Sequence, residues 1–332
     1  MGEQYAGRDA DRNLPAERSG VRFLIVTARS EGQRLDNFLL RELPGVPKTR
    51  LYKALRKGEV RVNRGRAKPG QRLTEGDSVR LPPLHQPARR KPPPVPWHWA
   101  ERLAGRVVLE DENLLVINKP SGLAVHGGSG VNLGLIECLR QLRPEDRDLE
   151  LVHRLDRDTS GLILVARRPR ALKALHEKLR GDGVEKVYLA LVAGRWPRGL
   201  HEVDAPLEKQ ARASGERVVR ASAAGRRSLT RFRVVERFPT ATLVEARPVT
   251  GRTHQIRVHA LHAGHPLVGD VKYQGEREAT LAEQGGLERL FLHAWRLCFS
   301  LGDPLRAYDL VAPLDPDLED FLEKLRNTMK KK

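Results

Sequence analysis

Residues 21–83 combine two helical apolar stripes with several short strand-like runs. The stripes have the i, i+3, i+4 spacing of one helix face and predict helices at residues 33–40 and 48–57. Gly58 ends the second helix, at a position where a left-handed residue is favoured. Short β-prone runs predict strands at residues 23–26, 60–62 and 78–81.

From residue 105 onward the pattern is dominated by strands. Residues 107–120 form two apolar runs around an Asp-Glu-Asn turn, which predicts a β-hairpin. Further strands are predicted at residues 162–165, 185–194, 230–238, 241–247 and 290–299, where the last closes the sheet. Helical stripes predict helices at residues 133–142, 169–180 and 316–325.

Polar and proline-rich segments divide the chain. Residues 1–20 are polar without periodicity, so we expect a disordered leader. Seven prolines lie between residues 82 and 96, and such a stretch predicts an extended chain. We therefore expect a linker at residues 84–104. A basic tail occupies residues 327–332. We therefore expect one domain at residues 21–83 and a second at residues 105–326.

The loop before the strand at residues 162–165 concentrates polar side chains. Asp156 lies between Arg154 and Arg157, Asp158 follows Arg157, and Gly161 supplies the turn into the strand. Guanidinium groups favour the charged form of a neighbouring carboxyl, and a strand-anchored loop holds it in place, as a nucleophile or a base requires. The alternative is an Asp-rich turn that caps local backbone amides. The loop alone leaves both interpretations open.

Two other stretches carry candidate functional groups. Lys186 and Tyr188 lie two residues apart in a predicted strand and therefore on one face. A packed sheet aromatic is the alternative to a functional Tyr188. Residues 209–227 are basic and rich in Gly, Ala and Ser, and predict an exposed hairpin that is either a flexible loop or an RNA-contacting arm.

Four histidines between residues 254 and 265 raise the hypothesis of a metal site. In a strand, His254 and His259 would face opposite ways, and no Cys, Asp or Glu lies among the four to complete a site. The only two cysteines are far apart, so neither a disulfide framework nor a cysteine-based zinc site fits. We expect packing and hydrogen-bonding roles for these histidines and no metal.

The chain carries 60 Lys and Arg against 42 Asp and Glu, a formal net charge of +18. Such an excess indicates a polyanionic partner, either nucleic acid or an anionic membrane. No apolar run reaches the length of a membrane span, and the N-terminus lacks a signal-peptide core. We therefore expect a soluble, cytoplasmic protein that binds nucleic acid and no membrane. Half of the excess, +9, lies in residues 21–83.

Four motifs in residues 21–83 resemble those of the S4 domain, a small αL-type RNA-binding module. They are Arg34-Leu-Asp-Asn-Phe-Leu, Pro47-Lys48, Arg56-Lys-Gly-Glu-Val-Arg-Val-Asn63 and Gly76-Asp-Ser-Val79. The resemblance implies that five basic residues face the RNA backbone: Lys48, Lys53, Arg56, Lys57 and Arg61.

Three motifs of the second region resemble those of the RluA-type pseudouridine synthases. They are His153-Arg-Leu-Asp-x-Asp-Thr-Ser-Gly161, Lys186-x-Tyr188-x-Ala190 and Gly251-Arg-Thr-His-Gln-Ile-Arg-Val-His259. The resemblance implies an α+β fold, in which the S4 domain precedes a catalytic domain with a mixed, mostly antiparallel central sheet flanked by helices. It also implies that uridine becomes pseudouridine: the bond from N1 to C1′ breaks and C5 bonds to C1′. No electrons, phosphate or metal are exchanged, so no cofactor is expected.

The same resemblance implies roles for individual residues. Asp156 corresponds to the essential aspartate, which acts either as a nucleophile at the sugar or as the base that removes a ribose proton. Arg257 corresponds to its basic partner, and Tyr188 to the residue that stacks on the uracil. Arg154 corresponds to the residue that enters the RNA where the target base leaves the stack. Arg252 and His254 are expected to support the active site, and Lys186 to contact RNA.

Residues 125–136 and the S4-like features look most like the C subtype, which modifies several uridines of bacterial 23S rRNA. The expected partner is 23S rRNA or the assembling large ribosomal subunit, bound by a monomer. Two alternatives remain open: a non-catalytic RNA-binding or ribosome-assembly factor, and a synthase of another rRNA or tRNA site. A glycosidase that uses Asp156 and Asp158 is disfavoured, because two carboxylates on one loop are poorly placed to straddle a sugar.

Overall fold

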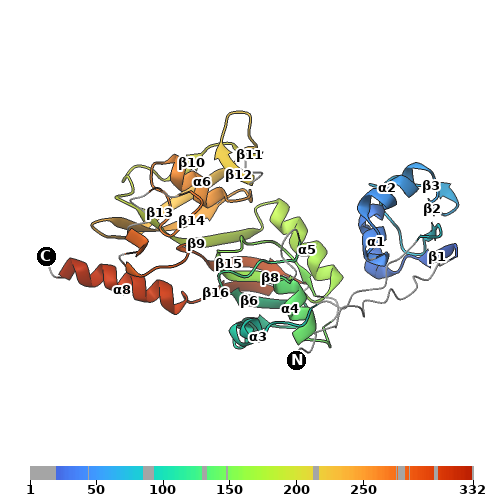
Figure 1. Cartoon of the computed structure of the whole chain (residues 1–332), viewed down its shortest axis with the longest axis horizontal. Helices are drawn as coiled ribbons and strands as arrows, with labels where there is room; N and C mark the ends of the chain where they lie inside the picture. Colours follow the sequence, from blue (N-terminus) through green and yellow to red (C-terminus); the bar gives the residue numbers. More distant parts are fainter. Residues whose placement is uncertain are drawn as a thin grey trace, which may run out of the picture. The chain divides into compact units, whose positions relative to one another are not determined.

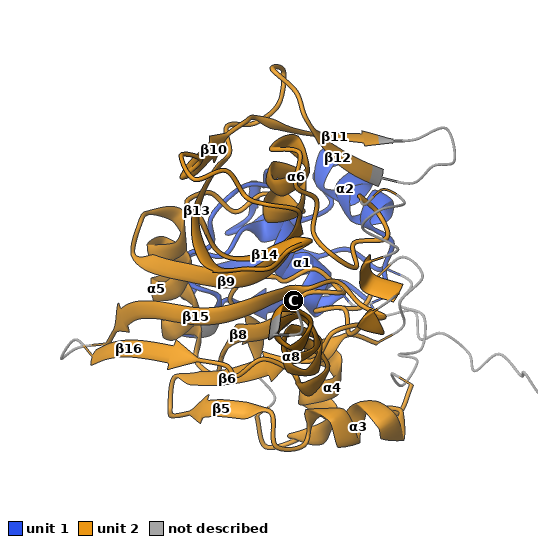
Figure 2. Cartoon of the chain, turned by 90° about the vertical axis from the view of Figure 1, so that its left-hand side faces the viewer, with its two compact units in different colours: residues 1–92 blue, residues 93–332 orange. Residues whose placement is uncertain are grey.

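The computed structural model of the chain (Figure 1) describes residues 20–43, 45–84, 93–128, 133–146, 149–211, 217–273, 275, 281–283, 285–302 and 306–330. The chain divides into two compact units, residues 1–92 and 93–332 (Figure 2). Except for residue 20, the expected leader lies outside the described residues, as do residues 85–92 of the expected linker and residues 331–332 of the tail. Within the described residues, no helix is long and apolar enough to cross a membrane.

The first unit is a four-stranded antiparallel sheet with two helices. Its strand order is β1-β4-β2-β3. Apolar side chains of both helices and of one sheet face share a single core, and Gly58 has the expected positive φ of 71°. The predicted helices and strands of this unit are therefore confirmed. The bounds are β1 Arg22–Ile25, α1 Leu35–Glu42, α2 Lys48–Arg56, β2 Arg61–Val62, β3 Gly65–Arg66 and β4 Ser78–Leu81.

The second unit is built on a mixed sheet with the order β10-β13-β14-β9-β15-β8-β6-β5. Only β8 and β15 pair in parallel along this path, so the expected mostly antiparallel sheet is confirmed. Its strands are β5 Val107–Glu110, β6 Leu114–Lys119, β7 Glu150–Leu151, β8 Ser160–Ala166, β9 Val184–Ala193, β10 Glu202–Asp204, β13 Leu229–Arg237, β14 Ala241–Pro248, β15 Leu292–Leu301 and β16 Arg306–Val311. A separate hairpin pairs β11 Leu207–Ala211 with β12 Arg217–Ala221.

Helices cover both faces of this sheet (Figure 2). Alternate residues of β6 and β8 pack against α5 Pro169–Arg180 on one side and α4 Leu135–Leu142 on the other. Further along the sheet, α6 Gln255–His262 and α8 Pro316–Lys330 cover opposite sides of β9 and β14. Every residue of β8 is buried, which explains its continuous apolar sequence.

Four predictions need correction. Residues 97–103 of the expected linker form a helix, α3 Trp97–Leu103, because Trp99 packs against the core beside α4. The expected basic tail begins inside α8, which continues to Lys330. Strand β15 does not close the sheet but lies between β9 and β8. The segment with His254 and His259 is a loop followed by α6, so the expectation that the two side chains face opposite sides of a strand does not apply.

Candidate active site

The register of three strands places Tyr188 beside the loop that carries Asp156. In β15, Ala294 lies opposite Gly161 of β8 on one side and opposite Tyr188 of β9 on the other. Residues 152–159, here called the Asp156 loop, end where β8 begins. The sheet therefore holds the loop and the tyrosine two strands apart.

Gly161 makes this close pairing possible. It lies within β8 rather than in the turn before it, and its φ is 106°. A Cβ at this position would lie 2.3 Å from the carbonyl oxygen of Ala294. Only glycine tolerates both the positive φ and the approach of β15.

Two side chains that follow strand β6 or end it hold the backbone of the Asp156 loop by hydrogen bonds. The Lys119 ammonium, wholly buried, donates to the carbonyl of Arg157 at 3.0 Å and to two carbonyls of its own segment. Ser121 Oγ donates to the carbonyl of Asp158 at 2.8 Å. Burial lowers the pKa of Lys119 to about 7, although three carbonyl acceptors favour its charged form. The loop is thus held by side chains that the sequence did not single out.

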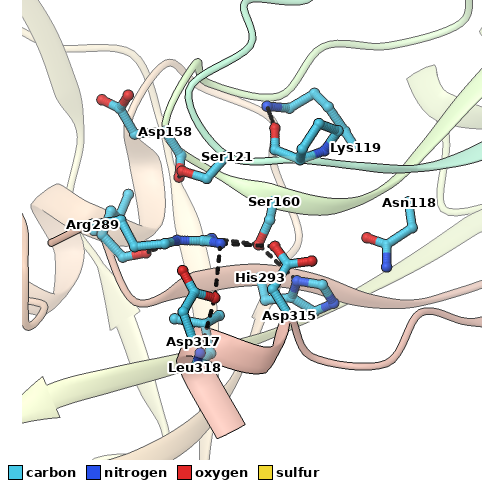
Figure 3. Close-up of polar contacts among 12 residues, drawn as sticks. Asn118, Lys119, Ser121, Asp158, Ser160, Arg289, His293, Asp315, Asp317 and Leu318 are labelled. Atoms are coloured by element: carbon cyan, nitrogen blue, oxygen red, sulfur yellow. Dashed lines mark hydrogen bonds and ion pairs between the residues drawn. The ribbon is translucent and has the colours of Figure 1, made fainter. Parts of the chain in front are cut away.

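A buried polar network supports the first residue of β8 (Figure 3). Arg289 donates to Ser160 Oγ and pairs with Asp315 at 2.8 Å, at the start of α8. Ser160 Oγ lies 2.8 Å from His293 Nδ1, and His293 Nε2 lies 3.2 Å from the carbonyl of Ala312. With the proton on Nε2, His293 accepts from Ser160 and donates to Ala312, so the neutral ring satisfies both partners. Burial lowers the pKa of His293 to about 4.

A cavity of about 760 Å³ opens beside the Asp156 loop and β9. It brings together the seven residues that the sequence assigned to this region: Arg154, Asp156, Lys186, Tyr188, Arg252, His254 and Arg257. They come from the Asp156 loop, from β9, and from α6 with the loop before it. Convergence from three distant segments favours a functional Asp156 over a turn that only caps its own backbone.

Asp156 faces a buried guanidinium that a second carboxylate holds in place. Its Oδ2 lies 3.6 Å from Arg257 Nη1, and its side chain is 18% exposed. Arg257 donates from Nε and Nη2 to both oxygens of the buried Asp270, at 2.7 and 2.6 Å. Burial acts to lower the pKa of Arg257, but Asp270 and Asp156 outweigh it and raise the pKa. Arg257 is therefore a fixed positive charge beside Asp156.

His254 extends the same cluster. It has a left-handed backbone (φ 53°) just before α6, which aims its ring back at the Asp156 loop. Tyr273 accepts the Val219 N–H at 3.0 Å, and its hydroxyl, which still has its proton to donate, lies 2.7 Å from His254 Nδ1. When the tyrosine hydroxyl donates to Nδ1, the proton of the neutral ring is on Nε2, 3.8 Å from Asp156 Oδ2. Burial lowers the pKa of His254, against the opposing charge of Asp156, so its neutral form is favoured.

Tyr188 and Lys186 line the cavity from β9. Tyr188 packs between the core beside α4 and the core beside α6. Burial raises its pKa, and the charge of Asp156 raises it further, so the hydroxyl stays protonated at neutral pH. Burial also lowers the pKa of Lys186. The tyrosine thus offers an apolar ring face with a neutral hydroxyl.

The other polar candidates have different surroundings. Asp158 pairs with Arg157 at 3.1 Å, is 39% exposed and does not line the cavity. Buried His259 lies 2.9 Å from Thr230 Oγ1 and 3.0 Å from the carbonyl of Ala205. Among the described residues, no group of three or more His, Cys, Asp or Glu is arranged to hold a metal ion.

The five basic residues predicted to face RNA from the first unit are all exposed. Lys48, Lys53 and Arg56 lie on α2, Lys57 caps it, and Arg61 lies in β2. Arg252, in the second unit, donates from Nε to the carbonyl of Arg227 at the cavity edge.

Sequence reasoning missed Asp270, Tyr273 and Lys119. Asp270 and Tyr273 lie after α6, in a stretch without a recognisable pattern, and only the fold brings them to Arg257 and His254. One general signal was present: a buried arginine needs a carboxylate partner, because an unpaired buried charge is costly. That rule predicts a partner without identifying it.

Two family models match this sequence. The one described as RNA pseudouridylate synthase matches residues 113–262, and the one described as S4 domain matches residues 33–79. Proteins of known name match along nearly the whole chain. Ribosomal large subunit pseudouridine synthase C of Escherichia coli is 52% identical over 319 residues, which cover 95% of this chain and 99% of that protein. The protein of the same name from Yersinia pestis is 53% identical over 308 residues, covering 92% and 96%.

Solved structures resemble about two thirds of the chain. The structure of human RNA pseudouridylate synthase domain containing 4 has a TM-score of 0.56 and 28% identity, and covers 69% of this chain and 96% of that one. Human RNA pseudouridylate synthase domain containing 1 has a TM-score of 0.54 and 24% identity, covering 68% and 94%. The second match supports the fold alone.

Proposed function

The chain belongs to the RNA pseudouridylate synthase family, and on that premise we propose that it isomerises specific uridines of 23S rRNA in the large ribosomal subunit. It is an RNA pseudouridine synthase with an N-terminal S4 domain. The names of the relatives support a large-subunit rRNA substrate, and the positive charge of residues 21–83 suits any RNA. In this proposal residues 21–83 hold the RNA and residues 105–326 carry out the reaction, in the cytoplasm and as a monomer.

The observation that carries the proposal is the convergence of Asp156, Tyr188 and Arg257 on one cavity. In the proposed reaction the target base leaves the RNA stack and enters this cavity, while the exposed Arg154 of the Asp156 loop takes its place. The ring of Tyr188 stacks against the uracil. Its raised pKa suits stacking better than proton abstraction, because a neutral phenol is a weak base.

Asp156 is the proposed reacting group. It either attacks C1′ of the ribose or removes a ribose proton, so that the bond from C1′ to N1 breaks. The uracil turns and C5 bonds to C1′; this step either displaces the Asp156 carboxylate from C1′ or is accompanied by return of the ribose proton from Asp156. The proton on C5 then leaves, and N1 gains a proton. Arg257, held by Asp270, keeps the carboxylate oriented throughout. This balance needs no oxidant, reductant or second substrate.

The loss of the C5 proton gives a direct test. A 23S rRNA transcript that carries tritium at C5 of uridine is incubated with the full chain, and tritium released to water is counted. We expect release that saturates at a small number of sites in each transcript. Tight binding without release would overturn the proposal and favour a non-catalytic RNA-binding factor. Release only from a tRNA transcript would overturn the rRNA substrate and keep the reaction.

A further inference from the structure

The first unit has a sheet face whose side chains the S4 resemblance leaves largely unassigned. Paired residues run in one row across all four strands: Phe23 of β1 lies opposite Arg80 of β4, which lies opposite Arg61 of β2, which lies opposite Arg66 of β3. Residues directly opposite each other in antiparallel strands point to the same face. One phenylalanine and three arginines therefore share one face of the sheet.

This face points away from the core. The neighbouring row, Leu24, Val79 and Val62, points into the core with the helices. Phe23 is 63% exposed and Ile25, on the same face of β1, is 61% exposed. Large apolar side chains so exposed on a strand indicate a binding surface, because folding alone gains little from them.

The guanidinium groups are oriented by backbone carbonyls. Arg80 donates to the carbonyl of Glu59 at 2.8 Å, and Arg61 donates to those of Gly58 and Arg64 at 3.3 Å. Arg66 donates to the carbonyl of Arg56 at the end of α2, so the row continues into the basic face of that helix. Each guanidinium has five N–H donors, and donors remain for phosphate oxygens.

A hollow of about 880 Å³ lies on this face, lined by Phe23, Arg61, Arg64 and Arg80 among others. Phe23 and Arg61 are two strand spacings apart, roughly 10 Å. No acidic residue occurs among the side chains of the four strands on this face. An exposed aromatic ring beside several arginines is the arrangement that binds single-stranded nucleic acid, by stacking a base and pairing with the backbone.

We propose that this sheet face binds a single-stranded segment of the RNA substrate, with an unpaired base stacked on Phe23 and its flanking phosphates on Arg61, Arg80 and Arg66. The inference rests on the proposed RNA substrate and adds a site for an unpaired strand beside the basic face of α2. The positive charge of the face argues for RNA rather than for a second copy of this equally basic unit.

The test uses the full chain with two probes, a short oligouridine and an RNA duplex of the same length. Phe23→Ala should weaken oligouridine binding roughly 5- to 100-fold and leave duplex binding unchanged, because only an unpaired base can stack on the ring. Phe23→Tyr keeps a ring face and should bind like the original protein. Arg61→Ala should make the slope of log affinity against log salt shallower by about 0.7, because one phosphate contact is lost. Arg72→Ala, which removes an exposed arginine outside the row, is the control.

A crosslink gives a second measurement that is independent of affinity. In 5-iodouridine-labelled oligouridine, irradiation should join the base to the peptide that contains Phe23. Equal weakening of single strand and duplex by Phe23→Ala, or crosslinks only to the second unit, would overturn the inference. So would a change in self-association without a change in RNA binding. Tritium release from the rRNA transcript is measured in parallel, so failure of this surface and failure of the proposed reaction are told apart.

Discussion

Arg257 lies between two carboxylates with different environments. Asp270 is buried and bidentate at 2.6 and 2.7 Å, whereas Asp156 is partly exposed and lies 3.6 Å away. The closer, buried partner fixes the guanidinium, and the more distant one is left accessible to a substrate. This division of roles leaves Asp156 free to react while Arg257 stays in place.

Asp270→Asn tests that division. We expect it to cost about 3 kcal/mol of folding free energy, because a buried ion pair loses one charge. Turnover should fall about 100-fold, since Arg257 is no longer held in position. Urea unfolding and tritium release measure the two effects.

Asp309→Asn is the matched control. Asp309 also forms a bidentate pair, with Arg296, but both side chains are exposed. Exposed pairs contribute at most about 1 kcal/mol, so stability and turnover should change little. If Asp270→Asn behaved like this control, Arg257 would not depend on its buried partner.

His293 makes stability depend on pH. Its pKa is lowered to about 4 by burial, with Asp315 opposing and Arg289 and Arg106 reinforcing the shift, so the folded protein resists protonation that the unfolded chain accepts near pH 6.5. The unfolded state then binds more protons, and stability should fall as the pH drops from about 6.5 to about 4. His293→Gln should flatten this decline in urea unfolding, whereas His262→Gln, on the exposed end of α6, should not. Equal slopes for both variants would refute the assignment.

At the residue scale, the sequence located the groups that lie within motifs and missed their supports. Asp156, Tyr188 and Arg257 were found because each lies in a short recognisable pattern. Lys119 was missed because a lysine before Pro120 carries no sign that it will be buried against the carbonyl of Arg157. Supporting contacts of this kind depend on which distant segments meet.

At the element scale, most strands and helices were predictable because their faces differ in polarity. Helix α6 was not predicted, and its histidines were considered only as part of a strand. Six of its eight residues are buried, including Gln255 and Arg257, so the helix has no polar face to reveal its period. The central place of β15 was also missed, because its parallel pairing with β8 joins strands far apart in the sequence.

Gly161 tests how β8 and β15 position the Asp156 loop. Gly161→Ala should destabilise the chain by about 3 kcal/mol, because a Cβ would meet the backbone of Ala294 at a positive φ. Gly199→Ala is the matched control, since nothing lies within 4 Å of a Cβ there. Thermal unfolding distinguishes the two. Similar melting temperatures for both variants would show that β8 and β15 can move apart at this position without loss of stability.

At the scale of the whole molecule, we propose that the two units divide binding and chemistry. The proposed catalytic residues all lie in residues 93–332, and the first unit contributes five exposed basic residues on and beside α2. This division was predictable, because the charge and the catalytic motifs lie in different parts of the sequence. The sheet face with Phe23 was not predicted, because it depends on which strands of the first unit pair.

Removing the first unit should change the salt dependence of RNA binding. A chain of residues 93–332 should bind the rRNA transcript more weakly, with a slope of log affinity against log salt that is shallower by about 4, if five phosphate contacts are lost. Lys48, Lys53 and Lys57 changed together to Ala in the full chain should give an intermediate slope. An unchanged slope in both would place RNA binding elsewhere.

The central claim is that Asp156 carries out isomerisation of uridines in large-subunit rRNA. The most direct measurement maps pseudouridines in a 23S rRNA transcript after incubation with the original protein, with Asp156→Asn and with Asp158→Asn. Asp158, two residues away, is paired with Arg157 outside the cavity and serves as the control. We predict new pseudouridines at the same positions with the original protein and with Asp158→Asn, and none with Asp156→Asn. Pseudouridine formation by Asp156→Asn at the original rate would contradict the account.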